Sequence, residues 1–296
     1  MVGHLSRNTP AALGTDGAGI IEAVGWYGRI DETTFQEKSI VESDIISKIP
    51  ESITDDEEST IPVAALAALV GLFRNTGIDV PTTGLTASGK GILILGGSSS
   101  VGQFGERLFR NMRFAALINS GLGSGIQLAR IAGFSPIVTT ASPQHAEFLK
   151  TLGATHVFDR NADVKTIQSA FPSPVSLILD SISVASTHSL ALDVLTTPSP
   201  PPGAHLAIAL PLDDSVKEKL KNVDNKVIVN HFFGSSHKFR DLSVPFWKNV
   251  GQWIKDGKFV PNRVRVVECG LPAISKALDL SLKGVSGLKI VIHPQE

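Results

Sequence analysis

The sequence predicts an α/β protein with a doubly wound parallel sheet, and two features lead to this prediction. From Gly91 onward, short runs rich in isoleucine and valine alternate with stretches of helical pattern. Each apolar run has four to seven residues, too short for a buried helix and suited to a strand covered on both faces. Strands that alternate with helices in this way form a parallel sheet with helices on both sides.

The expected elements divide the chain into two domains. The apolar run Ile61–Phe73 is expected to form a buried helix, and helices are also expected around 145–152 and 184–195. Residues 261–296 show the pattern strand, helix, strand, outside the main alternation. We therefore expect the sheet domain at 85–245 and a second domain formed by both chain ends, 1–84 and 246–296. The expected strands are GILILGG, PIVTT, THVFD, VSLILD, AHLAIAL and KVIVNHFF.

The composition is typical of a globular protein with a sizeable core. Hydrophobic residues make up 42% of the 296 residues, charged residues make up 19%, and the net charge is -1. This charge gives no basis for binding nucleic acid or an anionic membrane surface. No run approaches the ~20 apolar residues of a membrane span, and the N-terminus lacks a signal-peptide pattern, so we expect a cytoplasmic protein. The single cysteine, Cys269, excludes an internal disulfide and a four-cysteine zinc site.

The segment GILILGGSSSVG (91–102) is a strand that runs into a turn of small residues. Before a helix, such a turn lets backbone N–H groups approach a pyrophosphate, and the helix N-terminus adds partial positive charge. The strict G-x-G-x-x-G spacing is absent, so a tight strand-to-helix turn without a ligand is the alternative.

The end of the next strand bears on which dinucleotide would bind. An NAD-binding site usually carries Asp or Glu here, for the ribose 2′-hydroxyl. This chain has Thr139, Thr140, Ser142 and His145, with no acidic residue before Glu147. Hydroxyls and an imidazole can donate to a 2′-phosphate that a carboxylate would repel, so NADPH is favoured over NADH. Alternatively, Ser142 and the proline after it only begin a helix.

Several segments together resemble one family. GGSSSVGQ, IQLARIAGF, TTASPQHAEFLKTLGATHVFD, LILDSIS and GVSGLKIVIHP are similar to the nucleotide domain and tail of zinc-free medium-chain dehydrogenases/reductases. The resemblance is to fungal enoyl reductases and quinone oxidoreductase-like proteins. LGTDGAGIIEAVG and FQEKSIVESDIISKIPE resemble parts of that family's GroES-like catalytic domain. The resemblance implies a Rossmann-type sheet with a partial GroES-like β domain, no metal, and hydride transfer from NADPH to an activated C=C or C=O bond.

The resemblance also implies where the cofactor would bind. The glycine turn would hold the pyrophosphate, the residues after the second strand would face the 2′-phosphate, and Arg160 would lie near the adenosine. The residues after AHLAIA would flank the nicotinamide ribose, and the closing GVSG would contact the cofactor from the second domain. The expected cofactor-binding residues are Gly96, Gly97, Ser98, Ser99, Ser100, Val101, Gly102, Ser142, Pro143, Gln144, His145, Arg160, Leu210, Pro211, Val285 and Ser286.

The chain departs from the family pattern in three places. Fewer residues precede LGTDGAG than in the family, and the stretch after AVG is shortened. Residues at about 104–125 separate SSSVGQ from IQLARIAGF, which the family joins almost directly. This insertion is either a tolerated surface loop or the product of a misplaced exon boundary, which transcript sequencing would distinguish. The alternative to a working reductase is therefore an inactive nucleotide-binding remnant or a truncated gene product.

No side chain is assigned a catalytic role from the sequence. Tyr27 matches no family motif, and His205 lies within a strand, where a structural role is expected. His231 and Asp180 end expected strands, on the side where open α/β sheets bind ligands, although Asp180 could equally cap the next helix. Cys269 is expected to pack inside the second domain. The expected substrate is a small molecule or a carrier-bound chain, and a homodimer through an edge strand remains open.

Overall fold

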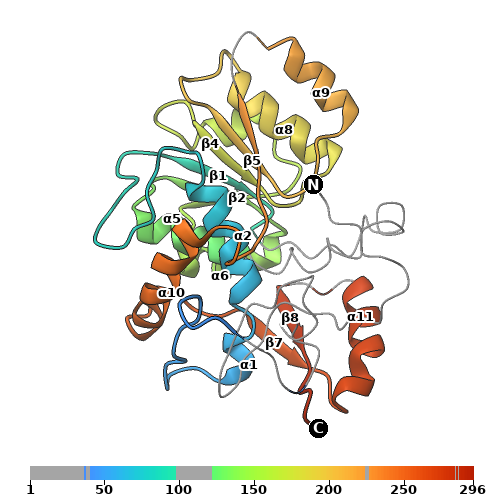
Figure 1. Ribbon diagram of the computed structural model, residues 1–296. Coiled ribbons are helices and arrows are strands. Elements are labelled where there is room, and N and C mark those ends of the chain that lie inside the picture. The colour runs from blue at the N-terminus through green and yellow to red at the C-terminus, as the bar shows by residue number, and fades with distance from the viewer. Residues whose placement is uncertain (1–36, 38–40, 98–121, 224–226, 284, 286) are drawn as a thin grey trace.

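A computed structural model of the protein describes residues 37, 41–97, 122–223, 227–283, 285 and 287–296. Its centre is a six-stranded sheet with the order β3-β2-β1-β4-β5-β6, in which every pair is parallel (Figure 1). This confirms the predicted doubly wound sheet, and all six strands lie in the predicted apolar runs. The strands are β1 Ile92–Leu95, β2 Ile137–Thr140, β3 His156–Phe158, β4 Leu177–Asp180, β5 His205–Ile208 and β6 Ile228–His231.

Helices cover both faces of the sheet. Successive side chains of each strand point to opposite faces, so an apolar strand presents apolar side chains on both sides. In β1, Ile92 and Ile94 pack against α2, α5, α6 and α10, and Leu93 and Leu95 face α7, α8 and α9. The helices on the first face are α2 Pro62–Phe73, α5 Leu122–Ala132, α6 Ala146–Leu152 and α10 Arg240–Lys255. Those on the second face are α7 Val164–Gln168, α8 Ala185–Thr196 and α9 Asp214–Lys221.

The helix α2 is apolar on all sides, and every residue in it is buried, as predicted for this segment. It follows the short helix α1 (Asp55–Glu58), which begins with a capping box between Thr54 and Glu57. In the described ranges, none of the helices combines the length and apolarity needed to cross a membrane.

The C-terminal segment forms the predicted strand–helix–strand unit. The strands β7 (Arg263–Val266) and β8 (Leu288–Val291) pair in parallel, and η3 (Leu271–Ala273) and α11 (Ile274–Leu282) connect them. Figure 1 shows this unit in red at the lower end of the molecule, with α1 beside β7. The helices α2 and α10 pack on the sheet although the expected boundaries would place much of them in the second domain, so the domain division remains a prediction.

An ion-paired histidine joins the C-terminus to α1. His293 Nε2 lies 2.7 Å from Asp56 Oδ1, and His293 Nδ1 lies 2.7 Å from Glu296 Oε1. The hydrogen bonds to Glu296 and Asp56 raise the pKa of His293, because both ring nitrogens donate only when the ring is protonated.

His293→Gln is expected to lower the melting temperature most at pH 6 and least at alkaline pH. A raised folded-state pKa stabilises the protein below the unfolded value of 6.5, and this stabilisation is lost as the pH rises through the folded-state pKa. The side chain is 41% exposed, so solvent screening should keep the effect below about 1 kcal/mol. Melting curves from pH 5.5 to 8.5, with His156→Gln as the control, test this; a difference that grows with pH would contradict it.

Candidate functional site

The candidate site lies where the strand order reverses. The chain passes from β1 outward to β2 and β3, then returns to β4 on the other side of β1. The register pairs Leu95 with both Thr140 and Asp180, so the carboxyl ends of β2, β1 and β4 meet at one edge of the sheet. In open parallel sheets, ligands bind outside the carboxyl ends of the strands at this switch point.

The glycine turn after β1 is held tightly against β2. The N–H groups of Gly96 and Gly97 both donate to the carbonyl of Thr140, at 3.1 and 2.9 Å. A Cβ atom at Gly97 would lie 2.4 Å from Thr139 Oγ1, so no side chain fits there. Because these two N–H groups already have an acceptor, donors for a pyrophosphate would come from later residues. Ser98, Ser99, Ser100, Val101 and Gly102 lie outside the described residues.

The helix α5 approaches the sheet closely through a small residue that the sequence patterns did not single out. A Cβ atom at Gly125 would lie 3.2 Å from Leu179 Cδ2 and 3.8 Å from both Ala68 Cβ and Ile94 Cδ1. Gly125 thus permits the close helix–strand packing that a glycine supplies in dinucleotide-binding βαβ units. Because α5 begins at Leu122, the last residues of the expected insertion lie inside this helix, and 104–121 lie outside the described residues.

The turn that follows β2 lies beside a positively charged side chain from just after the next strand. Ser142 precedes η2 (Pro143–His145), and Arg160, which follows β3, donates from Nη2 to Ser142 Oγ. Within the described part of the chain, no carboxylate forms an ion pair with Arg160. His145 is buried, and its Nε2 lies 3.2 Å from Gln144 Nε2. Burial, and then the charge of Arg263, lower the pKa of His145, so the ring is neutral at neutral pH.

The other predicted cofactor residues lie in two places. Leu210 is half-buried and Pro211 is exposed just after β5, at the carboxyl edge of the sheet. In the closing GVSG segment, Val285 is half-buried, and a Cβ atom at Gly287 would lie 3.2 Å from His145 Cε1. The C-terminal segment therefore lies close to the turn after β2. Ser286 lies outside the described residues.

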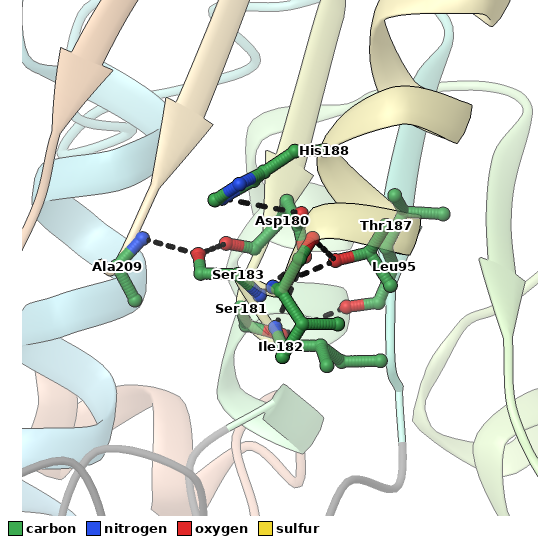
Figure 2. Close-up of polar contacts among 9 residues, drawn as sticks. Leu95, Asp180, Ser181, Ile182, Ser183, Thr187, His188 and Ala209 are labelled. Atoms are coloured by element: carbon green, nitrogen blue, oxygen red, sulfur yellow. Dashed lines mark hydrogen bonds and ion pairs between the residues drawn. The ribbon is translucent and has the colours of Figure 1, made fainter. Parts of the chain in front are cut away.

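A buried carboxylate organises the turn after β4 (Figure 2). Asp180 is fully buried, and its Oδ1 accepts hydrogen bonds from the N–H groups of Ile182 and Ser183 at 3.0 and 2.9 Å. Its Oδ2 points toward His188 Nε2 at 3.9 Å, and within the described residues it accepts no hydrogen bond. Desolvation raises the pKa of Asp180 to about 6, although its hydrogen bonds act in the opposite direction.

The same turn connects three strands. Ser183 Oγ donates to the Asp180 carbonyl at 2.7 Å and accepts from the N–H of Ala209, after β5, at 2.8 Å. Ser181 Oγ donates to the carbonyl of Leu95, at the end of β1, at 2.8 Å. Ser183 has a φ of 53°, a left-handed conformation that these hydrogen bonds stabilise. Asp180 therefore holds together the turn before α8, but it is not the N-cap of that helix, which is Val184.

The remaining candidate residues do not converge on the switch point. His205 is buried at the amino end of β5, where Nδ1 lies 2.7 Å from the Gly203 carbonyl, in line with its expected structural role. His231 is exposed at the carboxyl end of β6. The expectation that Cys269 packs inside the second domain is wrong: the residue is exposed, with a φ of 86°, and its N–H donates to Glu296 Oε2. Tyr27 lies outside the described residues.

Comparison with known proteins gives consistent results. Residues 121–246 match a family described as zinc-binding dehydrogenase. The chain is 27% identical over 270 residues to the dehydrogenase azaJ of Aspergillus niger, covering 88% of this chain and 70% of that protein. It is 28% identical over 320 residues to the trans-enoyl reductase tndF of Aspergillus flavipes, covering 96% and 82%. The crystal structure of an alcohol dehydrogenase superfamily protein from Novosphingobium aromaticivorans superimposes with a TM-score of 0.64 at 18% identity, covering 96% and 83%.

The sheet order, the glycine turn and the switch-point geometry define a Rossmann-type dinucleotide-binding protein. With these relatives, the chain is an oxidoreductase similar to dehydrogenases and trans-enoyl reductases, as its motifs predicted. Proteins of this class use a nicotinamide nucleotide as cofactor.

The residues of the chain that the structure describes do not fit a zinc ion, although the matched family is named for one. Among them, no three His, Cys, Asp or Glu side chains gather into a possible metal site. The single cysteine, Cys269, is exposed in the C-terminal segment, and no step of the chemistry below depends on a metal.

Proposed function

We propose that the protein is a zinc-independent reductase that uses NADPH to reduce an enone, an enoyl thioester or a quinone. The preference for NADPH is supported by the hydrogen bond from Arg160, after β3, to Ser142, after β2. The relative named as a trans-enoyl reductase supports the substrate class, and a small-molecule or carrier-bound substrate follows from it. When bound, the nicotinamide supplies a hydride to the activated C=C or C=O bond.

The turn after β2 is suited to a phosphate because it combines charge with hydroxyl donors. Arg160 has a planar group of N–H donors that matches phosphate oxygens in pairs. Ser142 already orients this guanidinium, so part of the entropic cost of ordering the arginine precedes binding. A carboxylate at this position would repel the phosphate, and the first acidic side chain, Glu147, forms an ion pair with Lys150.

The turn after β4 and the segment after β5 would hold the nicotinamide end. The hydrogen bond from Ala209 to Ser183 fixes these two segments relative to each other, and Leu210 and Pro211 follow directly. Leu210 and Pro211 would provide apolar contacts for the nicotinamide ribose. No titrating side chain is assigned as proton donor, and backbone donors could stabilise an enolate.

Titration of the purified full-length protein with NADPH and NADH tests the proposal. Arg160→Met is expected to weaken NADPH binding by about 10- to 100-fold, because a hydrogen bond to a charged group contributes roughly 1.5–3 kcal/mol. NADH binding should hardly change, because NADH lacks the 2′-phosphate. Lys165→Met, which removes an exposed cation on α7, is the matched control.

Two outcomes would contradict the proposal in different ways. Equal affinity of the unmodified protein for both dinucleotides would remove the preference for NADPH. A folded protein that binds neither dinucleotide would be an inactive relative of the reductases. If NADPH binds, its oxidation in the presence of enones, enoyl thioesters and quinones identifies the substrate class.

A further inference from the structure

A second arginine lies beside the turn after β2, and it comes from the opposite end of the chain. Arg263 is the first residue of β7, and its guanidinium carbon lies 4.3 Å from the ring centroid of Phe148 on α6. Phe148 is partly buried against the core on the first face of the sheet. A guanidinium stacked on an aromatic ring keeps its N–H donors at its edge, where they can bind an anion.

His145 connects this arginine to the proposed phosphate site. Phe148, on which Arg263 lies, is three residues after His145, and the charge of Arg263 helps to lower the pKa of His145. A Cβ atom at Gly287, in the same C-terminal segment as Arg263, would lie 3.2 Å from His145 Cε1. His145 is only three residues from Ser142, which binds Arg160. One cation from the end of β3 and one from β7 therefore lie beside the segment Ser142–His145.

Neither arginine is neutralised by the protein that the structure describes. Arg263 is exposed, and the described carboxylates form no ion pair with either Arg160 or Arg263. Two like charges near one turn disfavour each other, and a doubly charged phosphate removes this penalty while accepting hydrogen bonds from both.

We propose that Arg263 is a second specificity-determining residue for the 2′-phosphate of NADPH, acting together with Arg160. This inference rests on the proposed function, because it requires the 2′-phosphate to bind at the end of β2. Since Arg263 belongs to β7, the phosphate would also join the β7–β8 unit to the sheet. NADPH would then stabilise this contact, and NADH would not.

The experiment uses the full chain with Arg263→Met, Arg160→Met and the double variant, titrated with NADPH, NADH, 2′,5′-ADP and 5′-ADP. We expect Arg263→Met to weaken NADPH and 2′,5′-ADP binding by about tenfold and to leave NADH and 5′-ADP unchanged. Arg265→Met, two residues further along β7, is the matched control and should bind like the unmodified protein. Arg263→Lys, which keeps the charge but not the paired donors, should give an intermediate affinity.

Hydrogen exchange provides a measurement that does not depend on activity. In the unmodified protein, 2′,5′-ADP should slow exchange in β7 and β8, and this protection should disappear in Arg263→Met. If Arg263→Met binds NADPH as the unmodified protein does, and Arg160→Met does not, the inference about Arg263 is wrong and the proposed function stands. If the unmodified protein does not bind NADPH, the proposed function itself fails.

Discussion

Asp180→Asn is expected to stabilise the protein by about 3 kcal/mol at pH 8 and to leave its stability at pH 4 nearly unchanged. Asp180 is fully buried, and its pKa in the folded protein is raised from 3.8 to about 6, mainly by desolvation. Below pH 3.8 the carboxyl holds its proton in both states. As the pH rises to 6, only the unfolded state releases the proton easily, so stability decreases across this window. Asparagine has no proton to release and avoids this loss.

The amide also preserves the local hydrogen bonds. Its oxygen can accept from the N–H groups of Ile182 and Ser183, and its NH₂ group can face His188 Nε2 where the carboxylate oxygen now lies. Asp180→Ala is the informative comparison, because it is also uncharged but leaves both buried N–H groups without an acceptor. It should be less stable than Asp180→Asn by about 2–4 kcal/mol at every pH.

Urea unfolding of the three proteins from pH 4 to pH 8 measures these differences. His188 also lies in this cluster, and burial lowers its pKa, so its contribution is lost as the pH falls rather than as it rises. The difference in unfolding free energy between the unmodified protein and Asp180→Asn isolates the titration of Asp180, because His188 is present in both proteins. Parallel stability curves for these two proteins would show that Asp180 does not titrate in this window.

The sheet could be predicted from the sequence because its strands depend on local patterns. The central strands lie in apolar runs such as Ile92–Leu95, because a strand buried on both faces requires such a run. The segment Pro62–Phe73 could be predicted as a buried helix for the same reason, since it has no polar face. The glycine turn and the residues after β2 could be predicted as a cofactor site because their positions at the ends of strands carry the signal.

The rest of the site depends on contacts between distant residues, which no local pattern encodes. Arg263 contacts Phe148, which lies more than a hundred residues earlier in the chain. The one sequence signal for this site is the pair of basic residues in the expected strand RVRV. Asp180 could be placed at a strand end, but its hydrogen bonds to the turn before α8 could not be predicted from the sequence. The expected insertion includes Gly125, because the sequence pattern gives no sign that this glycine packs α5 against the sheet.

Gly234→Ala is expected to destabilise the protein by about 3 kcal/mol or more, because the new methyl group would collide with a backbone. Gly234 follows β6, and a Cβ atom there would lie 2.4 Å from the carbonyl oxygen of Val63 and 3.1 Å from its carbonyl carbon. Val63 lies in the first turn of α2, which is buried throughout, so neither a rotamer change nor a small helix movement relieves the contact. The segment after β6 and α2 would have to separate.

Two other glycines make this prediction specific. At Gly71 the collision is with the side chain of Leu179, which can move, so Gly71→Ala should cost less than Gly234→Ala. Gly84 has open space around its Cβ position and does not have a positive φ, so Gly84→Ala should change stability by no more than about 0.5 kcal/mol. Urea unfolding of the three variants gives the ranking. If Gly234→Ala were as stable as Gly84→Ala, the close approach of α2 to the carboxyl end of β6 would be incorrect, and α2 could not fix the position of that edge of the sheet.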